Sequence, residues 1–202
     1  MSEDRLARAL SAIDAANRED PNRDRENGTE YPKELLYGMR MSLWLSRLRS
    51  QPTEAQQLAA RGQHICRWKV PRTDYEATRE GYLRWRSHLY RYHADQVGDI
   101  LRASGYDEST IADVKRMVSK QGIKRDADVQ LIEDVACLVF LEYYFPAFAE
   151  GQSAEKVLDI VRKTWRKMSD AAHQAALKID YPDALKPLLE AALAPGSQSP
   201  QI

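Results

Sequence analysis

The sequence predicts an all-α protein folded as a single-domain helical bundle over residues 1–194. Apolar residues recur at helical spacing in most segments, and capping patterns or glycines separate one such segment from the next. No segment shows the alternation of apolar and polar residues that is typical of a half-buried strand. A chain of 202 residues is also long enough to bury a core within one domain.

The first elements are expected to be two helices joined by a polar loop. Asp4–Ala16 carries apolar residues at helical spacing, whereas residues 20–31 (DPNRDRENGTEY) contain Pro, Gly and Asn, which predict a loop. Pro32 suits the first turn of a helix that continues through Leu48. Four polar residues near this loop are expected to cap helices and order the loop rather than bind calcium, because the EF-hand spacing is missing: Asp14, Asn17, Asp20 and Asn22.

The rest of the chain is expected to be helical as well. Thr53 followed by Gln56 resembles a capping box and predicts a helix that runs toward Trp68. Further helices are expected at 75–103, at 111–120 after a cap at Asp107, from Asp126 through the segment 135–141, and at 154–167, 169–178 and 184–192. The segment 135–141 is apolar on all sides, which predicts burial on most faces. Residues 195–202 (PGSQSPQI) are expected to be disordered.

Composition indicates a soluble cytoplasmic protein. The 30 basic residues balance 30 acidic ones, so net charge points to neither nucleic acid nor membrane as a partner. No apolar stretch approaches the roughly 18 residues of a membrane span, and Met1–Arg8 does not resemble a secretory signal. The two cysteines, Cys66 and Cys137, lie far apart and fit neither a disulfide framework nor a zinc ribbon. The oligomeric state is not indicated.

Three ionisable residues, His64, His93 and Asp134, lie on three segments that are all predicted to be helical. Helices joined by short loops can bring such residues together in a bundle core, where these folds build metal sites. Imidazole and carboxylate suit Zn, Fe, Mn or Co, so a divalent metal ion is one expectation. The alternatives are a core histidine bonded to a backbone carbonyl at 64, a surface histidine or phosphate contact at 93, and a buried ion pair at 134.

A basic and aromatic stretch runs from Arg61 to His93, with eight Lys or Arg against three Asp or Glu. Arginine forks match phosphate geometry and stack on aromatic rings, and nucleobases also stack on such rings. The stretch therefore predicts an anionic pocket for a phosphorylated small molecule or nucleotide, and RNA is a further possible partner. The residues expected to bind are Arg67, Trp68, Lys69, Arg72 and Arg86. The alternative is a solvated helical face with aromatic residues in the core.

The order of these residues resembles the HD-domain superfamily of metal phosphohydrolases over residues 32–145. The similarity is carried by LLYGMRMSLWL, LAARGQHI, YRYHADQVGDILRASGYDESTIADVKRMV and IEDVACLVFLE. Tyr37 stands where the family has its first histidine, and Gln63-His64 stands where it has a His-Asp pair. His93 and Asp134 match by type and position. The resemblance implies an HD-like bundle with a degenerate motif.

The chain also resembles a bacterial family of unknown function. That resemblance is carried by AIDAAN and DPN (residues 12–17 and 20–22) and by RKTWRKMS (residues 162–169). It covers nearly the whole chain and implies no activity.

The HD resemblance implies a divalent-metal-dependent phosphohydrolase acting on a nucleotide or other phosphorylated small molecule. His64, His93 and Asp134 would hold the metal ion, Glu34 or Glu142 would orient the attacking water, and Tyr37 and Gln63 would line the substrate site. The alternative is a non-catalytic nucleotide- or RNA-binding protein with a degenerate HD site. Whether the chain is an enzyme stays open, and a two-iron oxygenase would need more ligands than the sequence offers.

Overall fold

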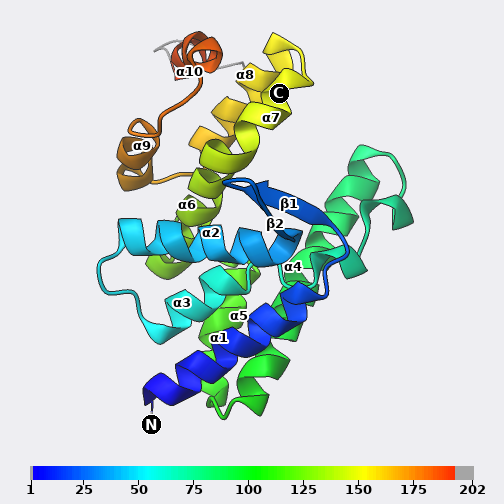
Figure 1. The fold of residues 1–202 in the computed structure, drawn as a ribbon, viewed down its shortest axis with the longest axis vertical. Coiled ribbons are helices and arrows are strands. Elements are labelled where there is room, and N and C mark those ends of the chain that lie inside the picture. Colours follow the sequence, from blue (N-terminus) through cyan, green and yellow to red (C-terminus); the bar gives the residue numbers. More distant parts are fainter. Residues whose placement is uncertain (1, 194–202) are drawn as a thin grey trace. The chain divides into compact units, whose positions relative to one another are not determined.

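The computed structural model describes residues 2–193 and confirms an all-α protein (Figure 1). The chain divides into two compact units, residues 1–132 and 133–202, with the boundary inside helix α6. The expected disordered tail at 195–202 lies outside the described residues. Among the residues that are described, no helix combines the length and the hydrophobicity needed to cross a bilayer.

Unit 1 holds most of the helices and a small hairpin. Its elements are α1 (Ser2–Arg18), β1 (Arg23–Glu26), β2 (Thr29–Pro32), α2 (Lys33–Leu48), α3 (Glu54–Arg61), the 3-10 turns η1 (Arg67–Lys69) and η2 (Arg72–Asp74), α4 (Arg79–Ala103), α5 (Glu108–Val118) and the start of α6 (Ala127–Val139). The core of this unit includes the fully buried side chains of Ile13, Leu36, Met41, Leu58, Ile65, Leu101, Ile111 and Ile132.

Unit 2 begins within α6. It continues with the π-helical segment η3 (Phe140–Tyr144), α7 (Phe145–Glu150), α8 (Ala154–Trp165), α9 (Asp170–Ala176), η4 (Asp183–Leu185) and α10 (Lys186–Leu193). The apolar side chains of α6 are buried as predicted, since Val135, Leu138 and Val139 are fully buried. Phe145, Val157 and Val161 add to the same core.

Local capping explains why most helices begin where the sequence predicts. Thr53 and Gln56 form the complete capping box at the start of α3. Asp107 accepts a hydrogen bond from the Thr110 N–H at 2.9 Å and caps α5, and Asp126 accepts from the Val129 N–H at 3.1 Å at the start of α6. These bonds satisfy donors that the first turn of a helix otherwise leaves unpaired.

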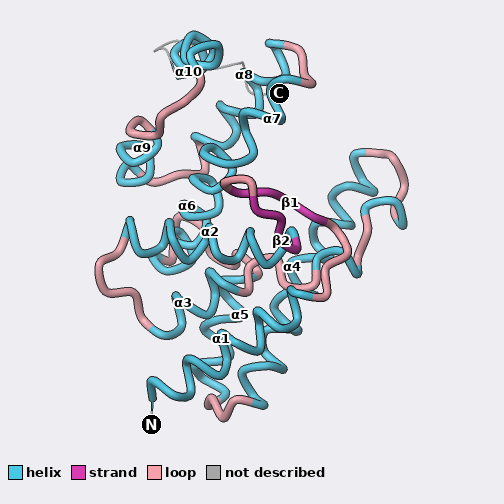
Figure 2. Tube along the Cα trace, viewed as in Figure 1, coloured by secondary structure: helices cyan, strands magenta, loops and turns pink. Residues whose placement is uncertain are grey.

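The prediction of a loop at residues 20–31 is wrong in part, because most of this segment forms a β-hairpin (Figure 2). Strand β1 pairs antiparallel with β2 in the register Arg23 with Pro32. Asn27 and Gly28, at φ 49° and 79°, form the turn, as expected for a type I′ connection. Apolar and polar residues do not alternate along these strands. Charged contacts hold the hairpin in place of an apolar face.

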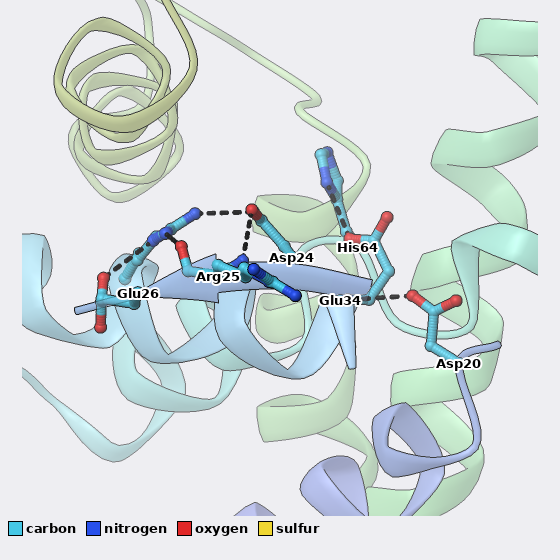
Figure 3. Close-up of polar contacts among 7 residues, drawn as sticks. Asp20, Asp24, Arg25, Glu26, Glu34 and His64 are labelled. Carbon is cyan, nitrogen blue, oxygen red and sulfur yellow. Dashed lines mark hydrogen bonds and ion pairs between the residues drawn. The ribbon is translucent and has the colours of Figure 1, made fainter. Parts of the chain in front are cut away.

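Arg40 on α2 makes those charged contacts. Its side chain donates to Asp24 Oδ2 at 2.9 Å, to Glu26 Oε1 at 3.1 Å and to the Arg25 carbonyl at 3.2 Å. Figure 3 shows Asp24, Arg25 and Glu26 grouped above α2. A buried guanidinium needs such a full set of acceptors, so the hairpin and α2 form one structural piece.

The helix predicted to run toward Trp68 ends earlier, at Arg61. A Cβ atom at Gly62 would lie 2.4 Å from Val97 Cγ2 on α4, so only glycine fits this close approach. Cys66 then takes a left-handed conformation at φ 52°. His64 therefore lies on a loop between α3 and η1 and not on a helix, which corrects the sequence prediction.

The long helix predicted from Tyr75 begins at Arg79. The Thr78 side chain accepts from the Gly81 N–H at 3.0 Å and caps α4. Just before it, Arg72 donates to the carbonyls of Tyr75 at 2.8 Å and Glu76 at 2.7 Å. These backbone contacts fix the segment between η2 and α4 in a non-helical path.

Candidate functional site

The loop from Gly62 to Cys66 is anchored by the end of α1. The Arg61 guanidinium donates to both carboxylate oxygens of Asp14, at 2.6 and 2.7 Å. The Cys66 N–H donates to Asn17 Oδ1 at 3.0 Å. The expectation that Asp14 and Asn17 order a loop is thus confirmed, and the loop that they order carries Gln63 and His64.

Asp20 orders the start of α2 in a similar way. Its carboxylate accepts from the Asn22 N–H at 2.9 Å and from the Glu34 N–H at 3.0 Å. Glu34 lies in the first turn of α2, and Figure 3 shows its side chain between Asp20 and His64 of the loop 62–66.

His64 is held between an aromatic ring and a carboxyl group. The ring of Tyr37 stacks on it, with centroids 3.9 Å apart and planes at 9°. His64 Nδ1 lies 3.4 Å from Glu34 Oε2. The structure therefore places the predicted residues Glu34, Tyr37 and His64 side by side.

Burial and positive charge set the protonation of this pair. Burial raises the pKa of Glu34 to about 7, although the charge of Arg67 acts in the opposite direction. Burial and then Arg67 lower the pKa of His64 well below its usual value. The imidazole is therefore neutral at neutral pH, so its 3.4 Å contact with Glu34 is not an ion pair.

His93 on α4 is 1% exposed and has one ring nitrogen bonded. Nδ1 lies 2.7 Å from the Ile65 carbonyl and donates its proton to it. Burial lowers the pKa of His93 to about 3; the Ile65 bond acts against this shift, and Arg67 and Lys120 add to it. The ring is neutral, and its Nε2 is buried without a hydrogen-bond partner among the described residues. The ring centroids of His64 and His93 are 5.8 Å apart.

Gln63 shows the same pattern. It is 1% exposed, and its amide Nε2 donates to the Val118 carbonyl at 3.1 Å. Its Oε1 is buried and has no hydrogen-bond partner within residues 2–193. Such atoms are rare in folded proteins and call for an explanation.

These side chains share one pocket of about 170 Å³. Its lining is Gln63, His64, Arg67, Tyr82, Trp85, Arg86, Leu89, Tyr90, His93 and Lys120. Within the described part of the chain no Asp or Glu belongs to this lining, whereas three cationic side chains do. The pocket is therefore electropositive and also contains two neutral imidazoles.

Aromatic rings position the two arginines. Arg67 lies over the ring of Trp85, with Cζ 4.9 Å from the centroid. Arg86 donates to the hydroxyl groups of Tyr82 and Tyr90 and lies over both rings. Stacked guanidinium groups lose less conformational freedom when they bind an anion.

Other residues predicted to bind lie elsewhere. Trp68, Lys69 and Arg72 lie on η1 and η2 and, among the residues described, do not belong to the lining of this pocket. Arg72 is engaged by the backbone carbonyls before α4, as described above. A binding role for these three residues stays a prediction.

Asp134 and Glu142 lie in unit 2. The Asp134 carboxylate accepts from the Ser169 N–H at 2.8 Å and from Ser169 Oγ at 2.5 Å, and these bonds order the start of α9. Glu142 lies on the π-helical segment η3, and its charge adds to the burial that raises the pKa of Tyr181. Their predicted roles as metal ligand and water-orienting carboxylate stay predictions.

Whether this pocket fits a divalent metal ion depends on His64 and His93. Both are neutral, the form in which imidazole binds metals. A metal-bound histidine commonly donates its other ring N–H to a carbonyl, as His93 does to Ile65. Across residues 2–193, however, no three His, Cys, Asp or Glu side chains gather in a group that could hold a metal ion. The pocket thus offers two of the expected protein ligands.

Sequence reasoning missed Lys120 as a pocket residue. It follows α5 with a left-handed backbone at φ 59°, and its ammonium group lies 5.9 Å from the Tyr90 ring centroid. The glycine turn at 122 signalled the end of α5 but not where the preceding lysine would lie.

Comparisons with known proteins give a family and no activity. No curated protein and no solved structure matches the chain. The resemblance to the HD-domain superfamily therefore has no support from relatives and remains a prediction. A family model described as a domain of unknown function (DUF4202) matches residues 7–189, so the chain belongs to this uncharacterised family, as the second resemblance predicted.

Proposed function

We propose that unit 1 binds the phosphoryl group of a phosphorylated small molecule or nucleotide in the pocket between Gln63, His64 and His93. The observation that carries this proposal is the gathering of three cationic side chains, Arg67, Arg86 and Lys120, in one small pocket. Arginine forks bind phosphate oxygens in pairs, and a lysine adds a point charge. Partial exclusion of water strengthens these contacts.

The size of the pocket limits what it encloses. Sites that enclose a whole drug-sized ligand have about 300–1,000 Å³, whereas this pocket has about 170 Å³. It has room for a phosphoryl group and a few attached atoms. A nucleoside would extend past Tyr82 and Trp85, whose rings offer faces on which a base can stack.

Replacing Arg86 with alanine is expected to weaken binding of a phosphorylated ligand about 10- to 100-fold, because a charge-assisted hydrogen bond contributes about 1.5–3 kcal/mol. The measurement is titration calorimetry with AMP and ribose 5-phosphate. Arg84→Ala, on the exposed side of the same helix, is the matched control and should leave the affinity unchanged. Equal losses in both variants, or none in either, would refute the proposal.

A longer ligand such as RNA would add phosphate contacts outside the pocket. Each neutralised phosphate releases counterions, so the affinity for RNA would fall steeply with salt, whereas a single phosphoryl contact gives a shallow dependence. Comparing AMP with an oligoribonucleotide over a salt series therefore separates the small-molecule proposal from the RNA alternative.

The second candidate function is a metal-dependent phosphohydrolase, and the orientation of His93 favours it. His64 and His93 would hold the divalent ion, which would lower the pKa of a bound water and polarise a phosphoryl oxygen. Arg67 and Arg86 would stabilise the charge on the phosphoryl group. Glu34 would hold or release a proton beside His64.

If this second function holds, the purified protein should bind about one Zn²⁺ or Mn²⁺ ion per chain. His93→Gln should weaken that binding at least about tenfold, because it removes an imidazole ligand. Titration calorimetry and elemental analysis measure this directly. His88→Gln is the control, since His88 lies on the same helix but is exposed. Metal binding that does not change in His93→Gln would exclude this site.

A further inference from the structure

Two buried hydrogen-bond acceptors of pocket residues have no donor within the part of the chain that the structure describes. They are Gln63 Oε1 and His93 Nε2, and both residues line the same pocket. The other polar atom of each side chain already donates a hydrogen bond to a backbone carbonyl. Gln63 Nε2 donates to Val118 at 3.1 Å, and His93 Nδ1 donates to Ile65 at 2.7 Å. The acceptors are therefore fixed in place.

Neither side chain can reverse its orientation without loss. A flipped Gln63 amide would bring Oε1 against the Val118 carbonyl, which is also an acceptor. A flipped His93 ring would replace the bonded N–H with a C–H group facing Ile65. The two backbone carbonyls thus select the arrangement in which Gln63 Oε1 and His93 Nε2 remain as acceptors in residues that line the pocket.

A fully deprotonated phosphoryl group does not by itself satisfy this arrangement. Its oxygens are acceptors and pair with Arg67, Arg86 and Lys120, but they offer no donor to Gln63 Oε1 or His93 Nε2. The missing partners must be O–H or N–H groups. In a pocket of about 170 Å³, such groups have to lie close to the phosphoryl group.

We infer that the pocket selects a phosphomonoester that carries a free hydroxyl group near its phosphoryl group, as in a short polyol phosphate or a sugar phosphate. This inference rests on the proposed phosphoryl-binding function and adds a ligand class to it. The three cationic side chains bind the phosphoryl group, while Gln63 and His93 accept hydrogen bonds from the hydroxyl groups. An analogue without hydroxyl groups leaves both buried acceptors unpaired, and such losses give strong discrimination.

The experiment compares glycerol 3-phosphate with propyl phosphate, which has the same carbon chain and no hydroxyl groups. Titration calorimetry is run at fixed pH and ionic strength with a chelator present. Glycerol 3-phosphate should bind at least about tenfold more tightly than propyl phosphate. Equal affinities would overturn the inference and leave the phosphoryl-binding proposal standing. If neither compound binds, and AMP and ribose 5-phosphate do not bind either, the proposed function itself fails.

Variants identify the atoms responsible. In Gln63→Met and His93→Phe, which are close in shape but lack the acceptor, the ratio of the two affinities should fall toward one. In Arg86→Ala both affinities should fall and the ratio should persist, because the lost contact is with the phosphoryl group that both compounds share. A ratio that persists in both acceptor variants overturns the inference. A preference that appears only after Zn²⁺ or Mn²⁺ is added does the same, because a metal ion would then pair with these acceptors.

Discussion

Replacing Arg40 with alanine is expected to lower the free energy of unfolding by about 3 kcal/mol. The Arg40 side chain is 6% exposed and holds the carboxylates of Asp24 and Glu26, which are 28% and 32% exposed. Removing one partner of a buried ion pair typically costs about 3–5 kcal/mol, and the partial exposure of the carboxylates places this case at the low end. Urea denaturation followed by circular dichroism measures the change.

The matched control is Arg25→Ala in the same hairpin. The Arg25 side chain is 75% exposed and lies 3.6 Å from Glu30, so its removal should cost less than about 1 kcal/mol. A loss of similar size in both variants would mean that the hairpin is not held through Arg40. A loss for Arg40→Ala alone would establish that the hairpin and α2 are stabilised together.

Glu34→Gln is expected to become more stable relative to the wild type as pH rises, by about 2–3 kcal/mol between pH 5 and pH 8. The pKa of Glu34 is raised from 4.5 to about 7 in the folded chain, with burial as the main cause. The folded wild type therefore binds a proton that the unfolded chain loses above pH 4.5, and its stability falls as pH rises through 7. A glutamine keeps the shape and has no proton to lose.

His93→Gln provides a comparison of opposite sign. The pKa of His93 is lowered from 6.5 to about 3, so the wild type loses stability as pH falls below 6.5, when the unfolded chain takes up a proton. The variant should therefore gain on the wild type toward acid pH. Both series are measured by urea denaturation with a chelator present. A Glu34→Gln difference that stays constant from pH 5 to pH 8 would contradict the burial of an ionisable carboxyl group.

Helices were predictable because their signals are local. The capping box at Thr53 and Gln56 and the cap at Asp107 lie within a few residues of the helices that they start. The hairpin was missed because Arg40, which holds it, lies outside the segment and pairs with it only after folding. The dipeptide Asn27-Gly28 was the one local signal for it, and a type I′ turn is its usual meaning.

The sequence predicted the kind of residues that line the candidate site better than it predicted which individual residues do so. The charge surplus between Arg61 and His93 pointed to Arg67 and Arg86, which do line the pocket. The same surplus could not show that Arg72 turns toward backbone carbonyls. Lys120 escaped prediction because its place in the pocket depends on packing between α4 and α5, which no local pattern records.

The anchoring of the site loop by α1 has a consequence for how the pocket forms. Asn17 and Cys66 lie 49 residues apart, and Asp14 and Arg61 lie 47 apart. Closing so long a stretch of chain carries an entropic cost that must be met before these bonds form. The anchoring residues Asp14 and Asn17 can make these bonds only when Arg61 and Cys66 are in place. The pocket therefore depends on the docking of α1 against the loop 62–66, and a ligand bound there stabilises only those molecules in which this docking is complete.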